Sequence, residues 1–249
     1  MRRLILSDIH ANFPAFEAVL DHAGNYDEII FLGDLVNFGP HPCECIDLMR
    51  ELNAFCIMGN HDYLIAHRDK KRNFWDEWAR SQLSDNQLIY LKSFRDNMVI
   101  DNEIYALHGS YCVPYDILPN TPHEQIENAF KDYIPQKTKK VIFGHYHYQV
   151  DVTYNNVEYH CIRPVGHHRD KDNRASYSIL ENNQLTHFRV PYDIERTIND
   201  VDKIDCFDNE GKQRWKQFLR NAFDEKFLKN DIVQMIANDI TKWRGLNDC

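Results

Sequence analysis

The stretch Leu4–His10 reads LILSDIH, a short apolar run that ends in an aspartate and a histidine two residues apart. Three consecutive large aliphatic residues are typical of a strand that is buried on both faces. Asp8 and His10 follow at the carboxyl end of that strand, which is the edge where open α/β sheets bind ligands. If the backbone stays extended there, both side chains point to one side and reach a single ion.

The same arrangement recurs along the chain. Each further cluster of metal-ligand residue types follows an apolar run that reads as a strand, and these clusters are Gly33-Asp34, Gly59–Asp62 (GNHD), His108-Gly109 and Gly144–His147 (GHYH). An isolated Asp-x-His is more often a turn or a helix cap than a pair of ligands. Five clusters in one order, all at strand ends, instead indicate one metal site.

Strand and helix patterns alternate through the first 60 residues. Leu4–Leu6, Glu28–Leu32 and Phe55–Met58 are expected to be strands, and helical spacing begins after Asn12 and again over His41–Leu52. This alternation is the βαβ pattern of a sheet flanked by helices.

The second half of the chain is richer in strand patterns. The pairs Asp101-Asn102, Asn155-Asn156 and Asn182-Asn183 each separate two apolar runs, which predicts three β-hairpins. Helical spacing covers Phe74–Phe94 before them and resumes at Ile194 after them. The last helical region has two apolar faces, formed by Trp215, Phe218, Leu219, Ala222 and Phe223 and by Ile232, Met235, Ile236, Ile240 and Trp243.

We therefore expect an α/β fold, a four-layer α/β/β/α sandwich of two mixed β-sheets flanked by helices, with a helical C-terminal extension. Residues 1–193 are expected to form the metal-binding domain, and residues 194–249 the extension that packs on it. The apolar faces of the extension leave a lid or a homodimer contact through the C-terminal helices as alternatives.

Composition and charge narrow the class of protein. The net charge of −9 argues against polymeric nucleic acid as a partner, because phosphate backbones require a basic surface. A small phosphate ester stays open, since a metal site supplies its own positive charge. The sequence has no run of about 18 apolar residues, so no membrane association is expected. Seven scattered cysteines without a Cys-x-x-Cys pair predict free thiols in a reducing cytoplasm.

The ordered clusters resemble the motifs of the calcineurin-like metallophosphoesterase superfamily. Gly33–Pro40 (GDLVNFGP) and Arg174–Tyr177 (RASY) resemble its small bacterial phosphodiesterase and phosphatase members in particular, and the resemblance runs from about Leu4 to Tyr192. It implies a pair of divalent metal ions. It implies that the first ion is held by Asp8, His10, Asp34 and His147, and the second by Asp34, Asn60, His108 and His145. It also implies His61 as the catalytic acid and phosphate contact, positioned by Asp62.

The residue types agree with this chemistry. A carboxylate such as Asp34 has two oxygens and can bridge cations about 3.5–4 Å apart. A mixed set of imidazole, carboxylate and amide ligands suits Mn²⁺, our first expectation, or Fe, Zn²⁺, Ni²⁺ or Co²⁺, better than Ca²⁺ or Mg²⁺. The expected reaction is in-line attack on phosphorus by a hydroxide that bridges the two metals, with His61 protonating the leaving oxygen.

The chain departs from the superfamily pattern in two places. Tyr146 stands between the histidines where threonine or serine is usual, which we interpret as altered packing behind the site. Cys161–Gly166 reads CIRPVG where close relatives carry NPGSVG, so the turn and the local pocket are expected to differ.

Other side chains are weaker candidates. For His41 two interpretations are open: it faces the substrate or, as we favour, it lies exposed in a loop. His167 and His168 are expected either to line the pocket or to lie on the surface. Arg163 contacts phosphate or, as the favoured interpretation, forms an ion pair behind the sheet. Cys112 has no evident base to activate it.

The expected function is hydrolysis of a small phosphate ester, with phosphodiesters favoured over monoesters by the tendency of the superfamily. One alternative within this class is a dinucleoside polyphosphate hydrolase. Another class also stays open, a metal-binding scaffold or interaction protein with weak or no catalysis.

Overall fold

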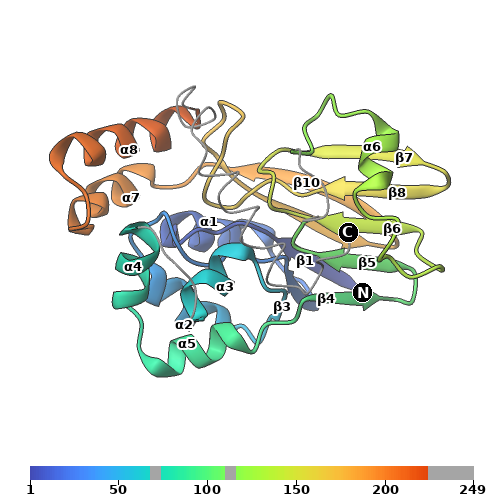
Figure 1. Cartoon of the computed structure of the whole chain (residues 1–249), viewed down its shortest axis with the longest axis horizontal. Coiled ribbons are helices and arrows are strands. Elements are labelled where there is room, and N and C mark those ends of the chain that lie inside the picture. The colour runs from blue at the N-terminus through green and yellow to red at the C-terminus, as the bar shows by residue number, and fades with distance from the viewer. Residues whose placement is uncertain (68–73, 110–115, 224–249) are drawn as a thin grey trace.

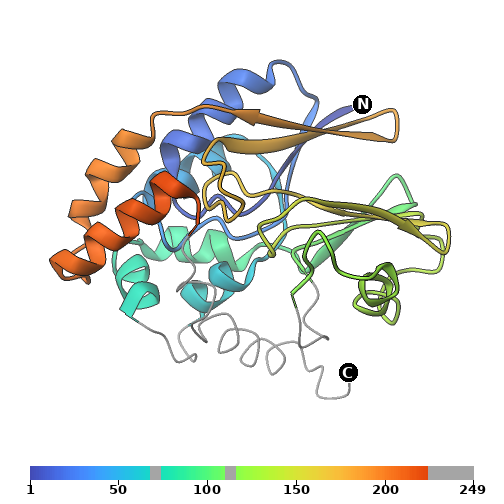
Figure 2. The same ribbon diagram turned by 90° about the horizontal axis from the view of Figure 1, so that it is seen from above.

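The computed structural model describes residues 1–67, 74–109 and 116–223, and its strands form two mixed sheets (Figure 1). The first sheet has the strand order β10 (Gln184–Val190), β9 (Ala175–Glu181), β1 (Arg2–Leu6), β2 (Glu28–Phe31) and β3 (Phe55–Cys56). The second has the order β4 (Asn97–Ile100), β5 (Ile104–Leu107), β6 (Lys140–Phe143), β8 (Val157–Cys161) and β7 (Val150–Tyr154). Figure 2 shows the two sheets as separate layers.

The parallel strands of both sheets carry the predicted ligands. In the first sheet β1 pairs in parallel with β2, and β2 with β3, while β9 and β10 add antiparallel strands. In the second sheet β5, β6 and β8 run parallel, with β4 and β7 antiparallel at the edges. Each parallel set therefore ends at one edge, and the loops that follow the strands meet there.

Helices cover the outer faces of the sheets, so the expected four-layer α/β/β/α sandwich is confirmed. One apolar cluster joins the first sheet to the helices on its outer face, another joins the second sheet to α6 (His123–Asn128), and a third fills the space between the sheets. The helices on the first sheet's side are α1 (Phe13–Ala23), α2 (Pro42–Glu51), α3 (Asn60–Ala66), α4 (Phe74–Ser81), α5 (Asp85–Lys92), α7 (Ile194–Asp200) and α8 (Asn209–Asn221).

The three predicted hairpin turns are also confirmed. Both central residues of each turn have positive φ, with values between 48° and 65°. This is the type I′ geometry, whose twist matches that of the flanking strands and which asparagine and aspartate tolerate.

Two predicted elements have different limits in the structure. The segment Phe74–Phe94 is broken into α4 and α5, because Ser84 caps α5 through a hydrogen bond from the Gln87 amide, and the Gln87 side chain accepts from the Ser84 amide. The strand predicted over Phe55–Met58 ends at Cys56, and Ile57 makes only an isolated bridge to Arg95.

The described part of the C-terminal extension packs into the main core. Trp215, Phe218 and Leu219 of α8 are buried in the same apolar cluster as residues of β1 and α1. The second predicted apolar face (232–243) and Cys112 lie outside the described residues. The described cysteines Cys43, Cys45, Cys56, Cys161 and Cys206 are free thiols. Within the described ranges, none of the helices has the length and apolarity needed to cross a membrane.

Candidate metal centre

The structure brings all seven predicted ligands together between the carboxyl ends of the strands. Asp8 and His10 follow β1, Asp34 follows β2, Asn60 opens α3 after β3, His108 follows β5, and His145 and His147 follow β6. Six of the seven are at most 2% exposed, with His145 partly buried. The two sheets thus supply complementary halves of one site.

The first group consists of Asp8, His10, Asp34 and His147, whose ligand atoms lie within 4.8 Å of one another. His147 Nε2 is 3.2 Å from Asp8 Oδ1 and 3.2 Å from His10 Nε2. On the other side of the ring, His147 Nδ1 is 2.5 Å from the carbonyl oxygen of His167 and donates to it. The proton is thereby held on Nδ1, which leaves the Nε2 lone pair for a cation.

The second group consists of Asp34, Asn60, His108 and His145. His108 Nε2 is 3.1 Å from Asp34 Oδ2 and 3.0 Å from Asn60 Oδ1, and His145 Nδ1 is 2.9 Å from the same Asn60 oxygen. His108 Nδ1 donates to the Leu32 carbonyl over 2.8 Å, so the Nε2 lone pair again points inward. Asp34 belongs to both groups.

This donor set fits two divalent cations. Oxygen and nitrogen lone pairs converge in a buried space, and the Asp8 Oδ1 atom has no hydrogen-bond partner. Burying converging acceptors without a donor or a cation costs several kcal/mol per group. Burial raises the pKa of Asp34, but the interaction with His108 outweighs it and holds the pKa well below its ordinary value. Burial likewise lowers the pKa of His145 to about 3, so this imidazole is neutral and able to ligate.

The backbone that carries these ligands is strained. Five of the seven ligands have φ between 50° and 70°, in the left-handed region that costs a non-glycine residue energy, namely Asp8, His10, Asp34, His145 and His147. The extended backbone expected from Asp8 to His10 is therefore wrong, although both side chains reach the same group. Such strain is typical of residues held in place for function.

Two glycines allow the ligand segments to approach closely. A Cβ atom at Gly59 would lie 2.1 Å from Asp34 Oδ1, and one at Gly144 would lie 1.8 Å from the Ser7 hydroxyl oxygen. Any side chain at either position would displace an aspartate of the site. This explains physically why the motifs carry glycine beside the ligands.

Asp62 does not position the His61 ring as expected. Its carboxylate accepts hydrogen bonds of 2.8–3.3 Å from the backbone N–H groups of Gly59, Asp34, Leu35 and Val36. Asp62 therefore organises the turn that presents Asp34. Burial, together with the negative charge of Asp34, raises the pKa of Asp62 to about 7.

The partner of the His61 ring is Asn37. His61 lies at the start of α3, not in an extended segment, and its Nδ1 is 2.8 Å from Asn37 Nδ2. Asn37 Nδ2 also donates to Asp76 Oδ1 over 2.7 Å, and Asn37 Oδ1 accepts from the Phe38 amide. These two contacts fix the amide orientation, so an N–H group faces His61 Nδ1. His61 must then accept at Nδ1 and carry its proton on Nε2. The only signal in the sequence for this contact is Asn37 itself, which belongs to the motif after Asp34.

An aromatic cover lies over the first group of ligands. Phe38 packs against His61 with ring centroids 4.6 Å apart and stacks on His167 at 5.1 Å. His167 in turn stacks on Trp215 of α8 at 5.4 Å. The C-terminal extension thus reaches the metal centre through two layers of rings.

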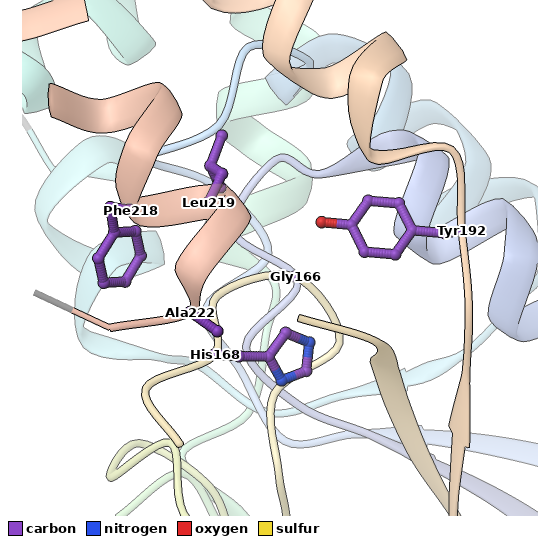
Figure 3. A pocket seen from close by; sticks show the side chains of 6 residues that line it. All are labelled: Gly166, His168, Tyr192, Phe218, Leu219 and Ala222. Carbon is purple, nitrogen blue, oxygen red and sulfur yellow. The ribbon is translucent and has the colours of Figure 1, made fainter. Parts of the chain in front are cut away.

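The two histidines after the altered turn are buried, not on the surface. His167 is 1% exposed and His168 is 4% exposed. Figure 3 shows His168 and Gly166 in a small pocket closed by Phe218, Leu219 and Ala222 at the end of α8. The turn itself is bonded to the ligand segment, because Val165 N–H donates to the Ser7 carbonyl and Gly166 N–H to the Asp8 carbonyl.

His41 is also buried, so its expected position in an exposed loop is wrong. Its Nε2 atom is 2.7 Å from Asp200 Oδ2 at the end of α7. Thr197 of the same helix donates to Asn12 Oδ1 over 2.8 Å. These two contacts fasten the extension to the loops beside the metal centre.

Two arginines lie near the altered turn, and the one whose charge acts on ligands of the site, Arg169, was not singled out from sequence. Arg163 forms an ion pair with Asp170 at 3.4 Å, as favoured from sequence. The Nε atom of Arg169 is buried without a hydrogen-bond partner. Burial lowers the pKa of Arg169, and the negative charges of Asp116, Asp8 and Asp34 oppose this. Burial and then the charge of Arg169 lower the pKa of His147. Sequence reasoning missed Arg169 because it belongs to no metal motif.

Comparisons with known proteins place these observations in a family. The sequence profile of the calcineurin-like phosphoesterases matches residues 1–188. A metallophosphoesterase from Sphaerobacter thermophilus superposes with a TM-score of 0.76 and 30% identity over 89% of this chain and 100% of its own. An uncharacterized protein of Methanocaldococcus jannaschii is 28% identical over 80% of this chain and 91% of its own length.

A third similarity is shorter. The symmetrical bis(5'-nucleosyl)-tetraphosphatase of Haemophilus ducreyi is 35% identical over 72 residues, which are 26% of this chain and 27% of that protein. The family match covers most of the chain and contains every one of the seven convergent side chains. This chain belongs to the calcineurin-like phosphoesterase family.

Proposed function

We propose that this chain is a binuclear-metal-dependent phosphoesterase that hydrolyses a small phosphate ester, with diesters preferred. The observation that carries the proposal is the pair of ligand groups that share Asp34, in a buried space lined by lone pairs. Asp8, His10, Asp34 and His147 would hold one ion, and Asp34, Asn60, His108 and His145 the other. Mn²⁺ is the expected metal, because the ligands mix imidazole with oxygen donors.

When bound, the two ions would supply Lewis acidity to the phosphoryl oxygens and acidify water at neutral pH. The protein residues hold this chemistry in place. The His167 carbonyl and the Leu32 carbonyl each keep one ligand histidine in the tautomer that leaves Nε2 free.

His61 is proposed to act on the leaving oxygen through Nε2–H. Its ring lies beside His10, with centroids 5.1 Å apart, and Asn37 holds the Nδ1 side. In this tautomer the ring donates a hydrogen bond to the charge that develops on the leaving oxygen, in place of the full proton transfer expected from the sequence. This contribution matters most for alkyl leaving groups, which develop more charge than activated aryl groups.

Arg169 is proposed to bind a non-bridging phosphoryl oxygen. Its Nε atom is buried and without a partner, and its charge is felt by His147, a ligand of the first group. A guanidinium provides paired N–H donors that match phosphate oxygens.

The preference for diesters follows the tendency of the calcineurin-like phosphoesterases, the family to which this chain belongs. The similarity to the Haemophilus ducreyi tetraphosphatase favours a dinucleoside polyphosphate as a second candidate substrate, since such molecules offer the same site a bridging oxygen between phosphoryl groups.

The proposal is tested with protein from which metal has been removed by a chelator and to which Mn²⁺ is then added. Hydrolysis of bis-p-nitrophenyl phosphate should require the added metal and exceed that of p-nitrophenyl phosphate. Diadenosine tetraphosphate in the same assay tests the second candidate. Absence of Mn²⁺-dependent turnover on all three substrates would refute the proposal.

A further inference from the structure

A second cluster of ligand side chains lies outside the catalytic centre and shares no residue with it. Asp151 of β7, His160 of β8 and His187 of β10 place one ligand atom each within 4.8 Å of the others. β7 and β8 belong to the second sheet and β10 to the first, so the cluster joins the edges of the two sheets. Both edges are visible beside one another in Figure 1.

The two histidines point at the same carboxylate oxygen. His160 Nδ1 lies 2.7 Å from Asp151 Oδ1, and His187 Nε2 lies 3.1 Å from it. The sheet register sets up the first pair, because Asp151 and His160 are directly opposite on β7 and β8. Tetrahedral Zn²⁺ with bonds of about 2.0–2.1 Å separates its ligand atoms by roughly 3.3 Å. The two nitrogens lie slightly closer than that to Asp151 Oδ1, and all three ligand atoms lie within 4.8 Å of one another.

The far side of each imidazole is already held by a hydrogen-bonding group. His187 Nδ1 is 2.7 Å from the hydroxyl of Ser178, its direct neighbour on β9. His160 Nε2 is 3.2 Å from Glu158 Oε2. Metal-ligating histidines are typically oriented in this way, with the nitrogen that does not bind the metal held by a carboxylate or an oxygen.

The surroundings of His160 carry a further physical argument. Each of its ring nitrogens faces a carboxylate oxygen, Asp151 on one side and Glu158 on the other. Glu158 Oε2 also accepts from Lys140 Nζ over 2.6 Å, so its charge is balanced without the histidine. A metal ion in place of the Nδ1 proton would bind between His160 and Asp151 and leave Nε2–H to donate to Glu158.

We propose that Asp151, His160 and His187 form a separate binding site for a zinc-class divalent cation, with the remaining position open to water. Two imidazoles and one carboxylate suit Zn²⁺, Co²⁺ or Ni²⁺ better than Ca²⁺ or Mg²⁺. The Asp151 side chain is 35% exposed, so an ion reaches the site from solvent. An ion there would link the β7–β8 hairpin to β10 and thereby clip the two sheets together.

The test counts bound zinc by equilibrium dialysis of the full chain. The wild type should bind one Zn²⁺ per chain more than either His160→Gln or His187→Gln. The control His123→Gln removes an exposed histidine of α6 and should bind as many ions as the wild type. Equal zinc content in the wild type and both cluster variants would overturn the proposal.

A second measurement needs no variant. Crystals of the wild type soaked in Zn²⁺ should give an anomalous peak between Asp151, His160 and His187 at data collected above the zinc edge. Zn²⁺ at about 100 times its dissociation constant should also raise Tm by roughly 5 °C or more, and His187→Gln should lose this part of the rise. Absence of the anomalous peak at saturating Zn²⁺ would contradict the site, whatever the outcome at the catalytic centre.

Discussion

Two groups of residues meet at the expected position of the metal ions, and they are built differently. We call them the ligand ring and the cover. The ring consists of Asp8, His10, Asp34, Asn60, His108, His145 and His147, which come from five strand ends. The cover consists of Phe38, His167, Arg169 and Trp215, of which His167 and Arg169 follow the altered turn and Trp215 belongs to α8. The ring carries the chemistry that the family shares. The cover is where this chain would distinguish one phosphate ester from another.

The largest effect is expected in the ring. Asp34→Asn removes the carboxylate that belongs to both ligand groups, so kcat/KM should fall by at least about 10³-fold as the stabilisation by two cations is lost. Metal content by elemental analysis should fall in parallel. Normal metal content with normal turnover would contradict the bridging role.

The next largest effect is expected at His61, which lies between the ligand ring and the cover. His61→Ala should lower kcat on an alkyl phosphodiester by about 10²–10³-fold, as expected for loss of a hydrogen-bond donor to developing charge. The loss on a p-nitrophenyl ester should be much smaller, because nitrophenolate needs little stabilisation. Equal losses on both leaving groups would show that His61 acts on the non-bridging oxygens instead.

A smaller effect is expected from the cover's arginine. Arg169→Gln removes a charge-assisted hydrogen bond worth about 1.5–3 kcal/mol, so kcat/KM should fall by roughly 10–150-fold. Arg163→Gln is the matched control, because that guanidinium already pairs with Asp170. The interpretation fails if the two variants have the same steady-state kinetics.

The smallest effect on turnover is expected at the outer layer of the cover. Trp215→Ala should lower the free energy of unfolding by about 3–5 kcal/mol, because a buried aromatic side chain is lost from the core. Turnover per folded molecule should fall far less than in Asp34→Asn, since no ligand is touched. Denaturant unfolding checks the first part, and an unchanged midpoint would show that α8 is not part of the core.

The sequence predicted the ring and the fold because both depend on local patterns. Apolar runs mark the strands, and a ligand cluster directly after a strand has only one edge of the sheet on which to lie. The break between α4 and α5 was not predicted. The apolar spacing is helical throughout this segment, and the break is set by Ser84, which caps the start of α5.

The cover could not be predicted in the same way. His167 meets Trp215, 48 positions further along the chain by number, through tertiary packing that leaves no periodic trace. Asn37, not Asp62, is the partner of His61. Asn37 has a left-handed backbone, and its side-chain amide lies against the His61 imidazole. The cluster of Asp151, His160 and His187 spans two sheets, so no short motif contains it.

The central claim is that two metal ions share Asp34. Diffraction from crystals grown with Mn²⁺, measured for anomalous scattering near the manganese edge, tests it most directly. We predict two peaks about 3.5–4 Å apart, one beside Asp8, His10 and His147 and the other beside Asn60, His108 and His145, with Asp34 in contact with both. Fewer than two peaks, or two peaks of which only one contacts Asp34, would contradict the account.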